Sequence, residues 1–270
     1  MHPIEHLRYV ARARGVDAST LVEESLAALE YLCRHPNDLL VACRRMVERH
    51  PTVAPLWWGC SHVLVAADPR GAARDVVGRL RRDDTASVLA SLLPADATVV
   101  TVGWPEVVGA AIERRDDIEV LAVDDGSGGF LRRVERTGIR CDPVPFESIV
   151  PAVSSADVVL LEAMAVAPGR VLAEPGAHEV AAAASSVGTP VWLVLPLGRR
   201  VQRGYLDRME RLVGPGRPDP VAGARAPGVD DVPIGFVTAV VDARGIHVEP
   251  ARVMAPDCPH APELLSASPL

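Results

Sequence analysis

The stretch ATVVTVGWPEVVGAAIERRDDIEVLAV, residues 97–123, contains the pattern that decides the fold. Two short apolar runs, 97–102 and 118–123, flank a segment with helical spacing over 105–114. Neither run alternates strictly between apolar and polar residues, which is typical of parallel strands covered by helices on both faces. A strand, a helix and a second strand in this order predict a βαβ unit.

The same alternation continues toward the C-terminus. Further apolar runs predict strands over 141–144, 158–161 and 191–195, and the segments between the runs predict helices over 130–137, 146–153 and 177–187. A closing hairpin is expected from strands over 236–241 and 246–249. We therefore expect an α/β protein with a Rossmann-like parallel-sheet domain over residues 94–250, followed by a flexible tail over 251–270.

The first 93 residues have a different pattern, with helical spacing almost throughout. Thr20 and Glu23 have the spacing of a capping box, and apolar residues then recur on one helical face. The helical pattern resumes after breaks at Pro36 and Pro51. Residues 1–93 are therefore expected to form an N-terminal helical domain.

The composition excludes several classes of function. The chain is 49% hydrophobic and 23% charged, as in ordinary globular proteins. Its net charge of -7 gives no general attraction to nucleic acid or anionic membranes, and no apolar run approaches the ~18 residues of a membrane span. The first residues lack a signal-peptide pattern, so we expect a cytoplasmic protein with no nucleic-acid or membrane partner. All 28 basic residues are arginines, which excludes Schiff-base and P-loop chemistry that needs a lysine.

Cysteine and histidine residues show no metal-binding arrangement. The five cysteines include no C-x-x-C pair, and the closest candidate pairs, His2 with His6 and Cys258 with His260, supply two ligands each. A protein metal site needs three or four convergent ligands. The glycine-rich loops also lack the G-x-G-x-x-G spacing of a dinucleotide site, so we expect neither a metal nor a cofactor.

In an open parallel sheet, the ligand crevice lies beyond the carboxyl ends of the strands. The loop after the first strand begins at Gly103 and leads into a helix whose free amides can hold an anion. The next loop places Gly128 and Gly129 beside Asp124 and Asp125. The glycines let backbone amides surround an oxyanion, whereas the aspartates would repel a phosphate and suit hydroxyl groups. A flexible turn with solvated acids is the alternative for this loop.

Two further loops offer charged candidates. Glu162 directly follows an apolar run, where burial would raise its pKa and suit an acid or base role. A salt-bridged or exposed glutamate is the alternative. Arg170, in the same expected loop, and Arg199, after the strand at 191–195, suit a carboxylate or phosphate ligand, although a surface pair with Arg200 is the alternative for Arg199.

Several segments together resemble the translation initiation factor 2B alpha/beta/delta-like family, which includes methylthioribose-1-phosphate isomerase and ribose-1,5-bisphosphate isomerase. Residues 50–58, HPTVAPLWW, are similar to the family segment R-P-T-A-x-N-L-x-W. Further similar segments follow in the family's order at 99–106, 138–139, 176–191 and 236–245. The resemblance covers roughly residues 20–250. It implies a helical domain before a Rossmann-like domain of the sugar-phosphate isomerase and CoA-transferase type, and a homodimer.

The resemblance also implies where chemistry would occur, and the sequence departs from the family there. The isomerases use a cysteine after the first sheet strand and an aspartate after the fourth, and these positions correspond here to Gly103 and to Met164 or Ala163. None of these side chains can transfer a proton. We therefore expect a non-catalytic protein that binds a small phosphorylated metabolite or nucleotide, or a protein partner.

The expected ligand contacts are Gly103, Gly128, Gly129, Arg170 and Arg199. The alternative function is an aldose-ketose isomerase of a phosphorylated sugar with a relocated acid–base pair. For that reaction the candidates are Glu162 together with Asp124 or Asp125.

Overall fold

The computed structural model describes residues 18–33, 36–123, 134, 137–213 and 228–266. The helices that precede the sheet are α2 (Ala18–Leu29), α3 (Pro36–Arg49), α4 (Ala54–Val65), α5 (Pro69–Arg81) and α6 (Thr85–Leu92). They agree with the helical spacing of the first 93 residues. A domain boundary at residue 93 stays a prediction. Most of the helix expected over 130–137 lies outside the described residues.

Helix α4 forms the centre of the N-terminal helices, and Trp57 and Trp58 on it are fully buried. α2 packs against α4 and α5. The expected capping box is wrong, because Thr20 lies inside α2 and the carboxylate of Glu23 pairs with Arg81 of α5 at 2.5 Å. Glu23 therefore ties two helices together instead of closing the start of its own.

The sheet is mainly parallel. Its parallel strands are β1 (Thr98–Val102), β2 (Glu119–Val123), β3 (Cys141–Val144), β4 (Val158–Ala167), β6 (Val191–Val194) and β8 (Ala239–Asp242), in the spatial order β3-β2-β1-β4-β6-β8. The edge strand β9 (Gly245–His247) pairs antiparallel with β8 through the turn that joins Asp242 to Gly245. The carboxyl ends of the six parallel strands therefore lie at one edge of the sheet.

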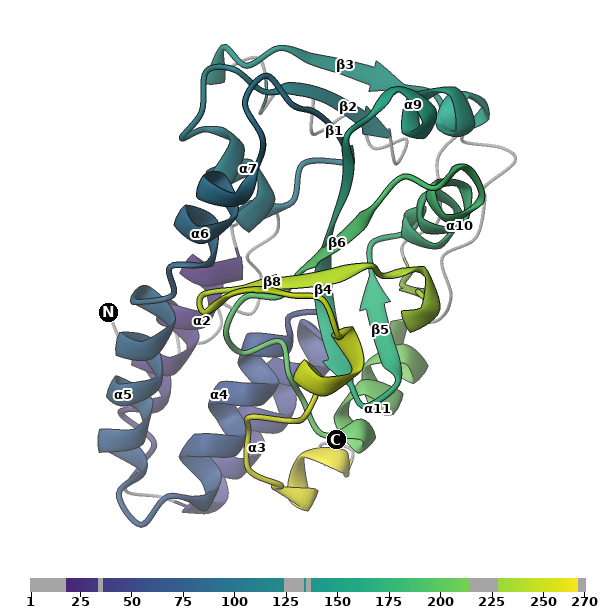
Figure 1. Ribbon diagram of the computed structural model, residues 1–270. Helices are drawn as coiled ribbons and strands as arrows, with labels where there is room; N and C mark the ends of the chain where they lie inside the picture. The colour runs from purple at the N-terminus through teal and green to yellow at the C-terminus, as the bar shows by residue number, and fades with distance from the viewer. Residues whose placement is uncertain (1–17, 34–35, 124–133, 135–136, 214–227, 267–270) are drawn as a thin grey trace.

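Helices cover both faces of this sheet (Figure 1). α6 and α7 (Glu106–Ile112) lie on one side, and α9 (Ile149–Ser155) and α10 (Ala177–Val187) lie on the other. Each face of the sheet has its own hydrophobic core, and neighbouring residues of β1 contribute to different ones. Val99 belongs to the core that contains Ile112 of α7, and Val100 to the core that contains Val180 of α10. Burial on both faces explains why these strands lack polar alternation.

The segment 162–170, which we expected to be a loop, is instead strand and hairpin. β4 continues through Glu162 to Ala167 and turns at Pro168 and Gly169 into the antiparallel strand β5 (Arg170–Ala173). Gly169, with φ of +76°, takes the left-handed position that a tight turn after a proline needs. The short strand β7 (Asp230–Asp231) pairs with β5.

Two features near the C-terminus differ from expectation. Helix α11 (Arg203–Val213) was not predicted, and it buries Tyr205, Leu206 and Met209. The expected tail is folded as far as residue 266, with Leu264 buried and the Tyr205 hydroxyl accepting a hydrogen bond from the amide of Ala261. The tail contains the short helices η3 (Pro250–Val253) and η4 (Pro262–Leu265). Two further short helices, η1 (Phe146–Ser148) and η2 (Ile234–Phe236), lie earlier in the chain. None of the helices in the described residues is long and apolar enough to cross a membrane.

Candidate functional site

Glu162 lies on β4 opposite Val194 of β6, at the edge where the parallel strands end. Its Oε2 accepts hydrogen bonds from the backbone amides of Val107 at 2.8 Å and Val108 at 3.2 Å. These amides belong to the first turn of α7, where backbone donors have no partner within the helix. The Glu162 carboxylate therefore occupies the position at which α7 would present its amides to an anion.

Arg199 holds the other oxygen of the same carboxylate. Its Nη2 lies 3.2 Å from Glu162 Oε1, and its Nη1 donates to the carbonyl oxygen of Met164 at 3.4 Å. The two charged side chains are only 8% and 10% exposed, so the ion pair is buried. Among the described residues, the Nε of Arg199 has no hydrogen-bond partner.

Burial raises the pKa of Glu162, and Arg199 and the amides of Val108 and Val107 oppose the rise. Both carboxylate oxygens are engaged by these groups. A general base must direct a lone pair toward a substrate proton, whereas the oxygens of Glu162 accept from Arg199 and two amides, so the geometry is that of a structural counter-ion. The salt-bridged alternative for this residue is the one that the structure contains.

The start of α10 is closed in the same way. Asp230, which is 9% exposed, accepts hydrogen bonds from the amides of Gly176 at 2.7 Å and His178 at 3.4 Å. The two helices that begin near the β1–β4 crevice thus both receive a carboxylate from the chain itself. A helix N-terminus that already holds a carboxylate has lost much of its attraction for a second anion.

Gly103 adopts the left-handed conformation with φ of +59°, as a tight turn after β1 requires. Its amide donates to the carbonyl oxygen of Val123 at 2.9 Å, and its own carbonyl accepts from the Thr101 hydroxyl. In this structure the Gly103 amide is therefore already bonded to β2, and its contact with a ligand stays a prediction.

Arg170 was also expected to contact the ligand, and the structure places it elsewhere. It pairs with Ala167, five residues along β4 from Glu162 or roughly 16 Å at the usual strand rise. Its guanidinium forms ion pairs with Asp231 at 2.7 Å and Glu210 at 3.2 Å. Arg170 therefore ties β5 to α11 and β7.

The described residues leave little space between β1 and β4. The cavity there has a volume of about 10 Å³ and is lined by Val102, Pro105, Glu162 and Ala173, among others. This is room for about one water molecule. Asp124, Asp125, Gly128 and Gly129 lie outside the described residues, so their roles stay predictions.

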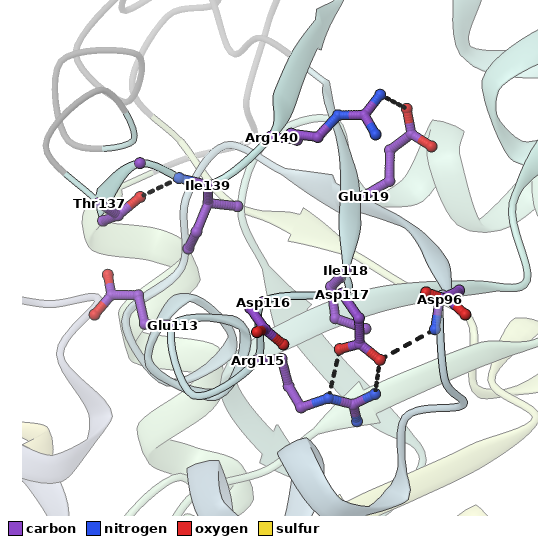
Figure 2. A pocket seen from close by; sticks show the side chains of 11 residues that line it. Asp96, Glu113, Arg115, Asp116, Asp117, Ile118, Glu119, Thr137, Ile139 and Arg140 are labelled. Carbon is purple, nitrogen blue, oxygen red and sulfur yellow. Dashed lines mark hydrogen bonds and ion pairs between the residues drawn. The ribbon is translucent and has the colours of Figure 1, made fainter.

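A larger hollow of about 850 Å³ lies at the amino ends of β2 and β3, away from the edge where the parallel strands end (Figure 2). Arg115 pairs there with Asp117 through two contacts of 2.7 and 2.6 Å, and also donates to the carbonyl oxygens of Ala90 and Leu93. The hydrogen bonds from Arg115 lower the pKa of Asp117 to about 2. These contacts fasten the connection between α6 and β1, so Arg115 and Asp117 have a structural role in this hollow.

Within the described residues, no cluster of histidine, cysteine and acidic side chains suits a metal ion.

No family model and no curated protein sequence matches this chain. Solved structures do match it. Translation initiation factor 2B of Pyrococcus horikoshii OT3 is 17% identical, with a TM-score of 0.75 over 93% of this chain and 98% of that one. The chain has the initiation factor 2B fold.

Two further structures support this assignment. The tetrameric beta2-delta2 complex of initiation factor 2B from C. thermophilum contains a chain 13% identical, with a TM-score of 0.68 over 93% of this chain and 92% of that one. The 5-methylthioribose 1-phosphate isomerase of Pyrococcus horikoshii OT3 is 15% identical, with a TM-score of 0.64 over 93% and 85%. At these identities the likeness establishes the fold, and at that level it confirms the resemblance found in the sequence.

Sequence reasoning identified Arg199 and the helix after Gly103 but missed that both contact Glu162. The amides of Val107 and Val108 carry no side-chain signal, and only the strand–turn–helix pattern at residues 98–112 indicates where they lie. Asp230 stands far along the chain from Gly176 and is next to a segment outside the described residues. Neither pairing could have been found from local spacing.

Proposed function

We propose that the protein is a non-catalytic binding protein with the initiation factor 2B fold. The observation that carries this proposal is the buried contact of Glu162 with Arg199 and the α7 amides. The chain's own carboxylate occupies the groups that would otherwise hold an anionic substrate. The resemblance implies the cysteine of the isomerases at Gly103 and their aspartate at Met164 or Ala163.

Aldose-ketose isomerisation requires a base that removes a proton from one carbon and returns it to the next. Among the described residues, the acidic residues that line the crevice are Glu174 and Glu162, and the candidate base is Glu162. To act on a substrate it would have to leave Arg199, and a buried guanidinium without its counter-ion is costly. This arrangement favours binding over turnover.

The proposed role is therefore to hold a small phosphorylated metabolite or nucleotide, or a protein partner. One of the structures with this fold is a tetramer of two kinds of initiation factor 2B subunit. We extend self-association to the present chain and propose that it forms a homodimer in the cytoplasm. Size-exclusion chromatography with light scattering checks the dimer, and a monomeric mass would contradict it.

One observation favours the alternative of an isomerase with a relocated acid–base pair. The pKa of Glu162 is raised by burial, as is common for carboxyl groups that act as general acids. That role would need the carboxyl group to be released from Arg199 when substrate binds.

The two functions are separated by incubating the purified protein with ribose-1,5-bisphosphate and with methylthioribose-1-phosphate, and following the products by ³¹P NMR. We expect no conversion of either compound. Product that disappears in Glu162→Gln but persists in Glu119→Gln, a change to an exposed carboxylate at the start of β2, would establish the isomerase instead.

A further inference from the structure

A second cavity at the ligand-binding edge of the sheet has a volume of about 420 Å³. It lies at the carboxyl ends of β6 and β8, which are parallel neighbours, and the end of α5 and residues 252–257 complete its walls. Its volume falls in the range of about 300–1,000 Å³ that is usual for small-molecule sites. In the strand order it stands beside the closed crevice between β1 and β4.

The lining of this cavity is rich in positive charge. Its arginines are Arg79, Arg82, Arg200, Arg244 and Arg252. Its acidic residues are Asp83, Asp242 and Asp257. The excess of guanidinium groups contrasts with the whole chain, whose net charge is -7. A local concentration of arginine in an acidic protein attracts anionic ligands.

One carboxylate serves several of these cations. Asp242, which is 4% exposed, contacts Arg200 at 2.6 Å, Arg244 at 2.7 Å and the Nε2 of His247 at 2.9 Å. Burial alone would raise the pKa of Asp242, but hydrogen bonds from Arg244 and His247 hold it well below its usual value. Asp242 alone cannot neutralise two guanidinium groups, and Asp257 is the second carboxylate that interacts with Arg200 and Arg244.

Arg79 and Arg82 come from the end of α5, three positions apart, and approach the cavity from the opposite wall. Arg79 lies over the ring of Trp58, 4.6 Å from its centre, which fixes the guanidinium without neutralising it. Within the described residues neither arginine forms an ion pair with a carboxylate. Arginines at a helix C-terminus also stabilise the helix dipole, but that role does not require them to face a cavity.

The other two acidic residues of the lining are Asp83 and Asp257, and Asp257 interacts with Arg200 and Arg79. Asp83 accepts hydrogen bonds from the amide of Leu197 at 2.9 Å and from the Thr85 hydroxyl at 2.7 Å. Asp83 therefore fixes the loop after β6 to the start of α6. Its negative charge remains in the lining, so five guanidinium groups against three carboxylates leave an excess of two positive charges.

We propose that this cavity binds a small phosphate monoester whose phosphate group is held by Arg79, Arg82 and Arg244. A dianionic phosphate matches the excess positive charge, and guanidinium groups form paired hydrogen bonds with phosphate oxygens. Leu195 and Leu197 line the remaining volume and suit the sugar or base of the ligand. The inference rests on the proposed binding function and moves its site from the closed crevice to this cavity.

The test is isothermal titration of the purified protein with inorganic phosphate, ribose 5-phosphate and AMP, with ribose and adenosine as uncharged controls. We expect the phosphate compounds to bind and the controls not to bind. Tighter binding of ribose 5-phosphate or of AMP shows whether the natural ligand is a sugar phosphate or a nucleotide, and either result supports the proposal.

Arg82→Gln and Arg81→Gln form a matched pair of variants, because both arginines are exposed and adjacent in the chain. Only Arg82 lines the cavity, whereas Arg81 pairs with Glu23. Losing one charge-assisted contact predicts affinity weaker by about tenfold in Arg82→Gln, with less than about a twofold change in Arg81→Gln. Circular dichroism checks that both variants fold.

The proposal is overturned if none of the phosphate compounds binds, or if the two variants lose affinity equally. Neither result touches the proposed absence of catalysis, which fails separately if the isomerase assay shows turnover.

Discussion

Replacing Glu162 with glutamine measures what the buried ion pair contributes. Glutamine keeps the side-chain volume and an oxygen that can still accept from the amides of Val107 and Val108. It removes the charge opposite Arg199, whose side chain is 10% exposed. Breaking a buried pair from one side costs about 3–5 kcal/mol of unfolding free energy. Burial raises the pKa of Glu162, which means that desolvation disfavours its charged form in the folded protein. Removing that charge recovers part of this cost, so we expect the lower end of the range.

A double-mutant cycle with Arg199→Met separates the pair from the two individual losses. Once Glu162 is glutamine, removing the guanidinium no longer leaves a charge unpaired, so the double variant is expected to be less destabilised than the sum of the single variants. A coupling of about 1–3 kcal/mol is expected for contacting groups. Urea unfolding followed by tryptophan fluorescence gives each free energy from the midpoint and slope.

A matched control is Glu119→Gln, because Glu119 pairs with Arg140 in a contact whose side chains are 39% and 82% exposed. An exposed pair contributes less than about 1 kcal/mol. If Glu162→Gln costs no more than this control, or if the double variant is additive, the carboxylate and Arg199 are not paired in solution.

Other contacts give further predictions. Asp242→Asn should lower the unfolding free energy, measured by urea titration, by about 3–5 kcal/mol, because buried Arg200 loses its counter-ion. Arg244→Gln, at a side chain 67% exposed, should lower it by less than about 1 kcal/mol. Folding lowers the pKa of Asp242, so its stabilising contribution is present at neutral pH and is lost as the pH falls below about 4. Urea unfolding midpoints measured from pH 6 to pH 2 should therefore fall less in Asp242→Asn than in the unmodified protein. Trp58→Ala, at a fully buried ring, should cost about 3–5 kcal/mol by thermal or urea unfolding.

Much of the α/β region could be predicted because local signals agree with the fold. The strand at 141–144 and the helix at 177–187 have the boundaries that were expected. Gly188, with φ of +83°, ends that helix in the left-handed conformation that glycine permits. The β8–β9 hairpin was also expected, since its turn contains Gly245, another residue with positive φ.

The second half of β4 could not be predicted with the same ease. Residues 162–167 are rich in alanine, which has low strand propensity, and pairing with β5 rather than propensity makes them a strand. Helix α11 was missed although Tyr205, Leu206 and Met209 have helical spacing, because the regular pattern loosens after Pro196.

The candidate site was harder to predict than the fold. Glu162 and Arg199 were both identified as separate candidates for contact with a ligand, and the structure joins them to one another. Their charges could be recognised in the sequence, whereas the partner of each charge depends on strands that lie far apart along the chain. Arg170 illustrates the same limit, since its partners come from α11 and β7.

A crystal structure of the protein grown with excess ribose 5-phosphate examines the closed crevice directly. We predict that the Glu162 carboxylate still contacts the Val107 amide and Arg199, and that phosphate density appears beside Arg82. Phosphate bound to the amides of α7, with Glu162 displaced from Arg199, would contradict this account.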